Sequence, residues 1–150
     1  MIQQALDFLK SHIEVALATC EGGRPHIRAF QIMKQEGTTL YFATSPEKQV
    51  YKQLHENPYI EIMASADEAF VKCSGRADFD VDDATARWIY EHNPVLPRLY
   101  TSYDKLAYFK MDIEQMDYYD LAPTPPVFKH YHLNNNTEAN GYVGERSSKA

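Results

Sequence analysis

Residues 24 to 58 read RPHIRAFQIMKQEGTTLYFATSPEKQVYKQLHENP, and this stretch decides the predicted fold. The apolar run at residues 27 to 33 contains strand-favouring residues, and the polar run after it contains a glycine where a turn needs one. Residues 40 to 44 predict the return strand, so the two strands are expected to form a hairpin. Ser45 and Pro46 suit the N-cap and first position of a helix that ends at Asn57-Pro58.

The start of this predicted helix is a candidate anion site. A helix N-terminus offers unpaired N–H groups and a partial positive charge. Here it also carries the hydroxyls of Thr44 and Ser45 and the ammonium group of Lys48. Arg28 lies on the preceding strand, and a guanidinium group can form a two-pronged contact with a phosphate. Single lysines and arginines are also common as ordinary surface charges, so the spacing alone leaves both interpretations open.

The remaining sequence predicts more strands and two further helices. Residues 2 to 11 repeat apolar side chains at helical spacing. Asp82 or Asp83 can cap a second helix, whose inward side carries Ala84, Trp88 and Ile89 and which ends before a stiff Pro94 to Pro97 elbow. Further strands are expected at residues 14 to 20, 59 to 64, 70 to 79 with a kink or bulge at Gly75, 106 to 113, and 115 to 121, after which Pro123, Pro125 and Pro126 end the sheet.

Length and charge limit the classes of protein and partner. With 150 residues, the chain is long enough for one domain of ordinary size, which we place at residues 1 to 133. Residues 134 to 150 are rich in Asn, Ser, Gly and charge, which predicts a disordered or loosely docked tail. The formal net charge of −6 argues against a nucleic acid or an anionic membrane as partner. No apolar run can span a bilayer and no signal-peptide pattern is present, so a cytoplasmic protein is expected.

Other groups of reactive side chains have ordinary explanations. His130 and His132 stand two residues apart and would share a strand face, but no third metal ligand is evident nearby. Cys20 and Cys73 have neither CxxC spacing nor a disulfide framework, which favours structural thiols. The chain has no GxSxG motif and no glycine-rich phosphate loop. We therefore assign no catalytic side chain and no metal ligand.

The order RPHIRAFQIM, turn, LYFATSPEKQVYKQLHENPYIEIM resembles the N-terminal half of the pyridoxamine 5′-phosphate oxidase-like family, the FMN-binding split barrels. Residues 69 to 77, AFVKCSGRA, resemble the next strand of that family, so the resemblance covers roughly residues 5 to 121. It implies a mainly β fold with flanking helices, built as a six-stranded antiparallel split β-barrel. It also implies a homodimer that binds FMN in a cleft at its interface.

The resemblance further implies which residues contact the cofactor. Arg28 and Lys48 would hold the phosphate, and Ala29 to Ile32 would offer backbone groups to the isoalloxazine ring. Ala43 and Thr44 would lie beside the ribityl phosphate. The complete predicted set of FMN-binding residues is Arg28, Ala29, Phe30, Gln31, Ile32, Ala43, Thr44, Ser45 and Lys48.

The function implied by the resemblance is that of an FMN-dependent oxidoreductase, in which the cofactor carries the redox chemistry and the substrate and electron donor are small molecules. An alternative is a non-catalytic protein that stores or senses FMN, or a split barrel that binds haem. Phe70 stands where the oxidase offers a glutamine and Glu47 where it has a second cation, and both differences favour the alternative. A haem protein would need an axial ligand, for which His130 and His132 are the candidates.

Overall fold

The strands of this protein carry side chains alternately on a buried and an open face, as a sheet with one covered face requires. The computed structural model describes residues 2 to 140. Its elements, in chain order, are α1 (Ile2–Ser11), β1 (Glu14–Glu21), β2 (Arg24–Gln31), β3 (Lys34–Glu36), β4 (Thr39–Thr44), α2 (Gln49–Glu56), β5 (Tyr59–Ala66), β6 (Ala69–Asp78), α3 (Asp83–His92), α4 (Val95–Leu99), the short 3-10 helix η1 (Tyr103–Lys105), β7 (Ala107–Asp112), β8 (Gln115–Asp120), β9 (Val127–His132) and β10 (Thr137–Asn140).

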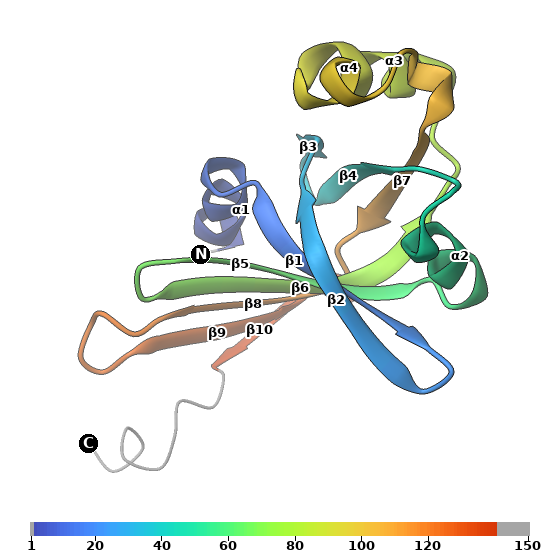
Figure 1. The fold of residues 1–150 in the computed structure, drawn as a ribbon. Coiled ribbons are helices and arrows are strands. Elements are labelled where there is room, and N and C mark those ends of the chain that lie inside the picture. Colours follow the sequence, from blue (N-terminus) through green and yellow to red (C-terminus); the bar gives the residue numbers. More distant parts are fainter. Residues whose placement is uncertain (1, 141–150) are drawn as a thin grey trace.

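The strands form one curled antiparallel sheet (Figure 1). Its main path runs β10-β9-β8-β6-β5-β1-β2, while β7 joins β6 to β4 and β4 also pairs with β3. The mainly β, split-barrel fold with flanking helices predicted from the sequence is confirmed. The described residues contain ten strands rather than six, and β3, β9 and β10 are among the additional ones.

Gly75 is the point at which β6 changes its pairing partner. Residues 69 to 74 pair with β8, whereas Ala77 and Asp78 pair with β7. A Cβ atom at Gly75 would lie only 2.6 Å from the backbone oxygen of Asp112 and from the Cγ atom of Met111. A glycine is therefore required for two strands to approach this closely. β6 pairs with β5 through Gly75 in unbroken register, so that ladder contains no bulge there.

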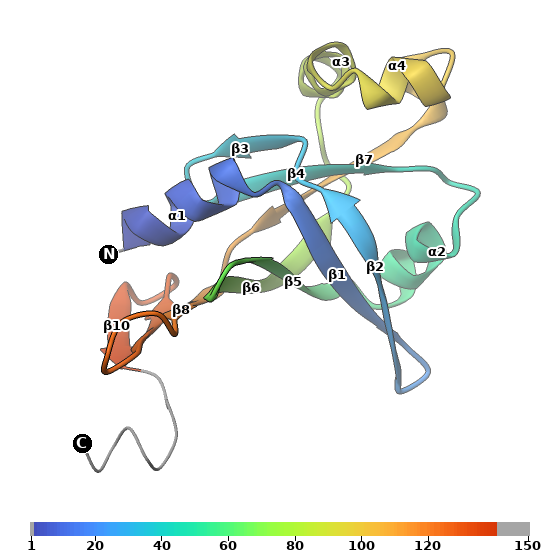
Figure 2. The ribbon, with the colours of Figure 1, turned by 60° about the vertical axis from the view of Figure 1, so that its left-hand side comes forward.

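Two hydrophobic clusters flank the sheet. The larger one fills the barrel, where the rings of Phe42 and Phe109 stack at 5.2 Å and Phe30 meets both edge-on. The smaller one joins α3 and α4 to the outer side of β4 and β7, around Ile89 and Leu96. Figure 2 shows this helical lobe at one end of the molecule, away from β8, β9 and β10.

The predicted hairpin between residues 27 to 33 and 40 to 44 is wrong. β2 pairs with β1, and β4 instead pairs with the short strand β3 and with β7. The chain bends between the two segments: the N–H of Ile32 donates to the carbonyl oxygen of Ile13 at 2.8 Å, and the N–H of Met33 donates to that of Tyr41 at 2.8 Å. This bend turns the chain from one half of the barrel into the other.

The helices also differ from the prediction in detail. α2 begins three residues later than expected, with Lys48 rather than Ser45 at its N-cap and no side-chain cap. In α3 the cap is Asp82 and Ile89 is buried, both as predicted. Ala86 is the other buried residue, while Trp88 is exposed and lies beneath the Lys34 ammonium group. The predicted elbow is the short helix α4, because a proline is tolerated in a first turn.

The end of the sheet lies further along the chain than predicted. The three prolines fall in the loop after β8, and β9 follows them immediately. β10 pairs with β9 inside the predicted tail, and all four of its residues are exposed. The rest of that tail, residues 141 to 150, lies outside the described residues. None of the helices in residues 2 to 140 is long and apolar enough to cross a membrane.

Candidate functional site

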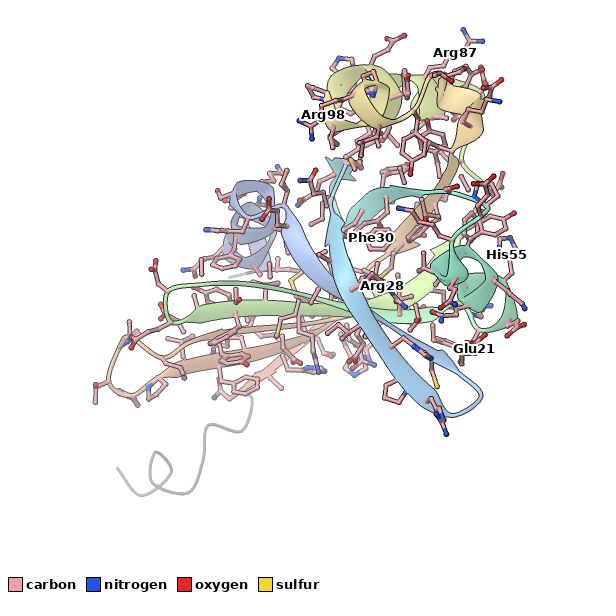
Figure 3. The ribbon with its side chains drawn as sticks, viewed as in Figure 1. Glu21, Arg28, Phe30, His55, Arg87 and Arg98 are labelled. Atoms are coloured by element: carbon pink, nitrogen blue, oxygen red, sulfur yellow. The ribbon has the colours of Figure 1, made fainter. Side chains whose placement is uncertain are left out.

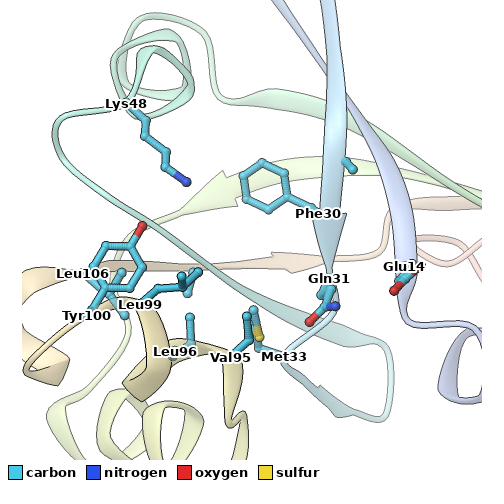
Figure 4. Close-up of a pocket in the computed structure, with 12 residues that line it drawn as sticks. Glu14, Phe30, Gln31, Met33, Lys48, Val95, Leu96, Leu99, Tyr100 and Leu106 are labelled. Atoms are coloured by element: carbon cyan, nitrogen blue, oxygen red, sulfur yellow. The ribbon is translucent and has the colours of Figure 1, made fainter.

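A cavity of about 390 Å³ lies between β2, the start of α2 and the helical lobe (Figure 4). Three parts of the chain supply most of its wall: the end of β2, the segment from β4 to Lys48, and α4 with its flanks. The lining residues are Glu14, Ala29, Phe30, Gln31, Met33, Ala43, Lys48, Val95, Leu96, Leu99, Tyr100 and Leu106. The cavity thus joins one polar wall, from the strand edge and Lys48, to an apolar wall from α4.

β2 presents unpaired backbone groups to this cavity. Among the described strands β2 pairs only with β1. The Ile32 N–H bonds toward β1, and in an antiparallel ladder every second residue bonds toward the partner strand. Phe30 and Arg28 therefore bond to β1, whereas the N–H and C=O groups of Ala29 and Gln31 point away from it. Both of these residues line the cavity, so a donor and acceptor edge is available to a planar ligand.

Lys48 is the cation of the cavity wall. Its backbone N–H donates to the carbonyl oxygen of Ser45 at 3.0 Å, which closes the turn that precedes α2. The side chain is exposed and forms no ion pair within residues 2 to 140. Figure 4 shows its ammonium group extending into the cavity from the start of α2. A charge in this position, at a helix N-terminus, favours an anionic ligand.

Arg28 is held by neutral acceptors. Its Nη1 donates to the carbonyl oxygen of Leu17 at 3.3 Å and to the Thr19 hydroxyl at 2.9 Å, and its Nη2 donates to Gln53 Oε1 at 2.8 Å. Figure 3 shows the side chain directed from β2 toward α2. Partial burial lowers the pKa of the guanidinium group, and no carboxylate lies within 4 Å of it among the described side chains. Arg28 is therefore a half-buried cation without a counter-ion.

Gln53 connects this cation to helix α2, and the sequence prediction missed it. Only 1% of the residue is exposed, and its Oε1 also accepts a 2.7 Å hydrogen bond from the Thr19 hydroxyl. Its Nε2 donates to a Glu21 carboxylate oxygen at 3.4 Å. The available signal was a polar residue within the apolar stripe of α2, between Val50 and Leu54. A buried amide in such a stripe must find hydrogen-bond partners elsewhere in the chain.

The nine predicted FMN-binding residues fall into two groups. Five line the cavity, namely Ala29, Phe30, Gln31, Ala43 and Lys48. Four are not among the lining residues, namely Arg28, Ile32, Thr44 and Ser45. Ile32 is buried in the barrel core, and the Ser45 hydroxyl accepts the backbone N–H of Glu47 at 3.3 Å. Thr44 is also buried, and its hydroxyl oxygen has no hydrogen-bond partner among the described residues. The cofactor contacts of all nine residues stay predictions.

The apolar wall was absent from the prediction. Val95, Leu96 and Leu99 of α4, together with Tyr100 after it, face Lys48 and Phe30 across the cavity (Figure 4). Leu99 is 65% exposed and forms the outer lip. Nothing in the local sequence placed this segment near β2, because the two are more than 60 residues apart and meet only through the helical lobe.

The histidine pair lies on a different part of the molecule. His130 and His132 share the open face of β9, and their ring centroids are 5.1 Å apart. The Nδ1 atom of His130 bonds to the Asp117 carboxylate on β8. Neither histidine lines the cavity beside β2. No group of three or more potential metal-ligating side chains occurs in the described part of the chain.

Known proteins share this architecture. The family model described as pyridoxamine 5′-phosphate oxidase matches residues 1–119. General stress protein 26 of Bacillus subtilis is 32% identical over 80 residues, which span 50% of this chain and 56% of that protein. The match thus covers little more than half of the relative's length.

Two solved structures, both below 25% identity, share the fold. A pyridoxamine 5′-phosphate oxidase-related, FMN-binding protein of Nostoc punctiforme gives a TM-score of 0.68 at 15% identity, covering 96% of this chain and 95% of that one. A haem-binding protein of Mycobacterium smegmatis gives 0.70 at 16% identity, covering 88% and 58%. The family model spans most of the chain, including α2 and all the residues that line the cavity. This chain therefore belongs to the pyridoxamine 5′-phosphate oxidase family.

Proposed function

We propose that the cavity beside β2 binds FMN and that the protein is an FMN-dependent oxidoreductase. The observation that carries the proposal is a pair of cations, Lys48 in the cavity wall and Arg28 on β2 next to the lining residue Ala29. Neither has a carboxylate partner among the described residues. A half-buried cation without a counter-ion, such as Arg28, favours an anion, and so does the ammonium group of Lys48 at a helix N-terminus. Family membership and the FMN-binding relative support a flavin phosphate as that anion.

The donor set of the cavity fits a flavin ring. The pyrimidine edge of an isoalloxazine carries both hydrogen-bond acceptors and an N–H donor. The free backbone N–H and C=O groups of Ala29 and Gln31 offer the complementary donors and acceptors. Phe30 and the α4 wall supply apolar surface, which suits the rest of the ring system. A cavity of about 390 Å³ lies in the usual range for small-molecule sites.

In this proposal Lys48 contacts the phosphate directly. Arg28 contributes the two guanidinium N–H groups that its three protein hydrogen bonds leave over, out of five. Ile32, Thr44 and Ser45 complete the contact set at the ends of β2 and β4. FMN supplies the electron or hydride chemistry when bound, and the protein binds it, orients it and excludes water. The proposal also includes a small-molecule substrate and a cytoplasmic location.

We further propose that two copies of the chain close this site. The open face of β1, β2 and β5 carries small and exposed apolar side chains, among which Ile27 is 71% and Tyr59 59% exposed. Ala29 lies on the same face of β2 as Ile27 and lines the cavity. A second copy placed on this face would therefore bury Ile27 and cover the open side of the flavin site.

Turnover separates an enzyme from a protein that only stores or senses FMN. The FMN-loaded protein is mixed with reduced nicotinamide, then with quinones, nitro compounds or free flavins, and the flavin absorbance is followed. If the protein is an enzyme, its bound flavin should be reduced and reoxidised faster than free FMN. Rates equal to those of free FMN would support a protein that only binds the cofactor. Haem is less favoured, because His130 and His132 lie on β9 and do not line the cavity.

A further inference from the structure

The three hydrogen-bond acceptors of the half-buried Arg28 guanidinium group are all neutral. The acceptors are the Leu17 carbonyl oxygen, the Thr19 hydroxyl and the Gln53 amide oxygen. The Thr19 hydroxyl in turn donates a hydrogen bond to the same Gln53 oxygen. A buried arginine is more often paired with a carboxylate, which would cancel its charge. The network therefore fixes the guanidinium group in place and leaves its positive charge uncompensated.

We propose that the neutral side chain of Gln53 preserves the site's preference for a phosphorylated flavin, because its amide oxygen accepts from Arg28 without neutralising the guanidinium charge. The inference rests on the proposed FMN site. Gln53 acts through Arg28 and through the position of α2, whose N-cap is Lys48, so it is a positioning residue rather than a ligand. A glutamate in the same place could still accept the hydrogen bonds from Thr19 and Arg28, but its negative charge would neutralise Arg28 and repel an anionic ligand.

The surroundings of Gln53 explain why an amide is needed. Its Oε1 accepts from Thr19 at 2.7 Å and from Arg28 at 2.8 Å, so the oxygen end faces the cation. Its Nε2 end faces Glu21 at 3.4 Å. Glu21 is in turn 4.0 Å from His26 Nε2. The Gln53 amide thus lies between Arg28 and the Glu21 carboxylate, and it donates a hydrogen bond to that carboxylate. A glutamate at position 53 could not donate this bond.

The decisive variant is Gln53→Glu, which changes charge but hardly changes shape. Dissociation constants for FMN and riboflavin are measured by flavin fluorescence, and their ratio reports the phosphate contribution. The wild-type protein is expected to prefer FMN, and Gln53→Glu should reduce this preference on the order of tenfold with little change in riboflavin binding. Gln3→Glu, an exposed site on α1, makes the same charge change as a control and should keep the wild-type ratio.

A second variant separates charge from packing. Gln53→Met fills the same space without a charge, so it should lower thermal stability but keep the FMN-to-riboflavin ratio within about threefold of wild type. The inference is overturned if Gln53→Glu retains the wild-type preference, or if Gln53→Met lowers that preference about tenfold or more. Because the methionine arm stands by itself, the test survives a glutamate variant that does not fold.

Inorganic phosphate distinguishes failure of this inference from failure of the proposed function. Phosphate should raise the melting temperature of the wild-type protein and of Gln53→Met more than that of Gln53→Glu. If wild-type protein binds no flavin, the FMN proposal fails, while the phosphate comparison still decides whether Gln53 controls an anion site. Equal phosphate shifts in wild type and Gln53→Glu would overturn the inference.

Discussion

The Arg28 guanidinium group donates a 2.8 Å hydrogen bond to the buried amide oxygen of Gln53 and thereby ties strand β2 to helix α2. This contact joins the two elements whose ends line the cavity, because β2 contributes Ala29 and Gln31 and the N-cap of α2 contributes Lys48. The position of the proposed phosphate site therefore depends on a hydrogen bond between side chains 25 residues apart in the sequence.

Removing the cation of the cavity should weaken FMN selectively. Lys48→Ala deletes a charge-assisted contact of roughly 1.5 to 3 kcal/mol, which is about one to two decades in the dissociation constant. Riboflavin lacks the phosphate, so its affinity should change far less. Fluorescence titration with both flavins measures the effect. Lys10→Ala, which removes an exposed lysine from α1, is the matched control. Equal losses for the two flavins would place the phosphate elsewhere.

Arg28→Ala should affect both FMN affinity and folding, because the residue has two sets of partners. It removes hydrogen bonds to Thr19 and Gln53 and leaves both buried groups with fewer partners, at a cost of about 1 to 3 kcal/mol. Urea unfolding should show this loss without flavin, and the FMN titration should show about one decade more than the riboflavin titration. A variant with full stability and unchanged FMN binding would contradict both roles.

Gly75→Ala should destabilise the barrel. The added Cβ atom would lie 2.6 Å from the Asp112 backbone oxygen, so β6 and β7 must move apart. Forced separation of packed strands costs about 1 to 3 kcal/mol. Urea unfolding measures the change, and Ser74→Ala on the half-exposed face serves as its neighbour control. If Gly75→Ala unfolds at the wild-type urea concentration, the close approach is not a constraint on the fold.

The cap of α3 should give an acid-dependent contribution to stability. Asp82 accepts a hydrogen bond from the Thr85 N–H at 2.7 Å, and this bond holds the pKa of its carboxyl group below the ordinary value. Because the folded-state pKa is lowered, the stabilisation is present above the unfolded pKa of about 4 and disappears as the pH falls through the folded value. Asp82→Ala should therefore melt below wild type at pH 7, and the difference should shrink below pH 4. A pH-independent difference would contradict this origin.

A charge on the open face of β2 should prevent self-association. Ile27 is 71% exposed beside the cavity, and Ile27→Glu would place a carboxylate inside the proposed dimer interface. Sedimentation velocity should show a dimer for the wild type and a monomer for the variant, with weaker flavin retention. Leu121→Glu, at a 50% exposed leucine after β8, is the control and should stay dimeric. A wild-type monomer that binds FMN fully would remove the need for a second copy.

Local patterns in the sequence predicted much of the fold. Helical spacing identified α1, a lone glycine in a strand marked the partner change at Gly75, and Asp82 was among the two predicted caps. The hairpin was misassigned because the bend at Ile32 and Met33 depends on two different partner strands. β9 was missed because prolines precede it, although they fall in the loop and spare the strand itself.

The site was harder to predict, because its parts meet only in three dimensions. Lys48 was selected through its place at the start of a helix, whereas Ala29 was selected only through the family resemblance. The Arg28 side chain is held by hydrogen bonds to Thr19 on β1 and Gln53 on α2. The local sequence around these two residues gives no sign that they bond to an arginine on another strand. The α4 wall depends on how the helical lobe packs against β4 and β7, and a proline-containing segment gave no sign of that contact.

The visible absorption spectrum after incubation with FMN and desalting tests directly whether the cavity holds FMN. We expect the flavin band to stay with the wild-type protein and to be weaker for Lys48→Ala. With riboflavin in place of FMN, the difference between the two proteins should be far smaller. A wild-type protein that leaves the column colourless would contradict the FMN proposal. Arg28 and Lys48 would then be cations with a structural or surface role only.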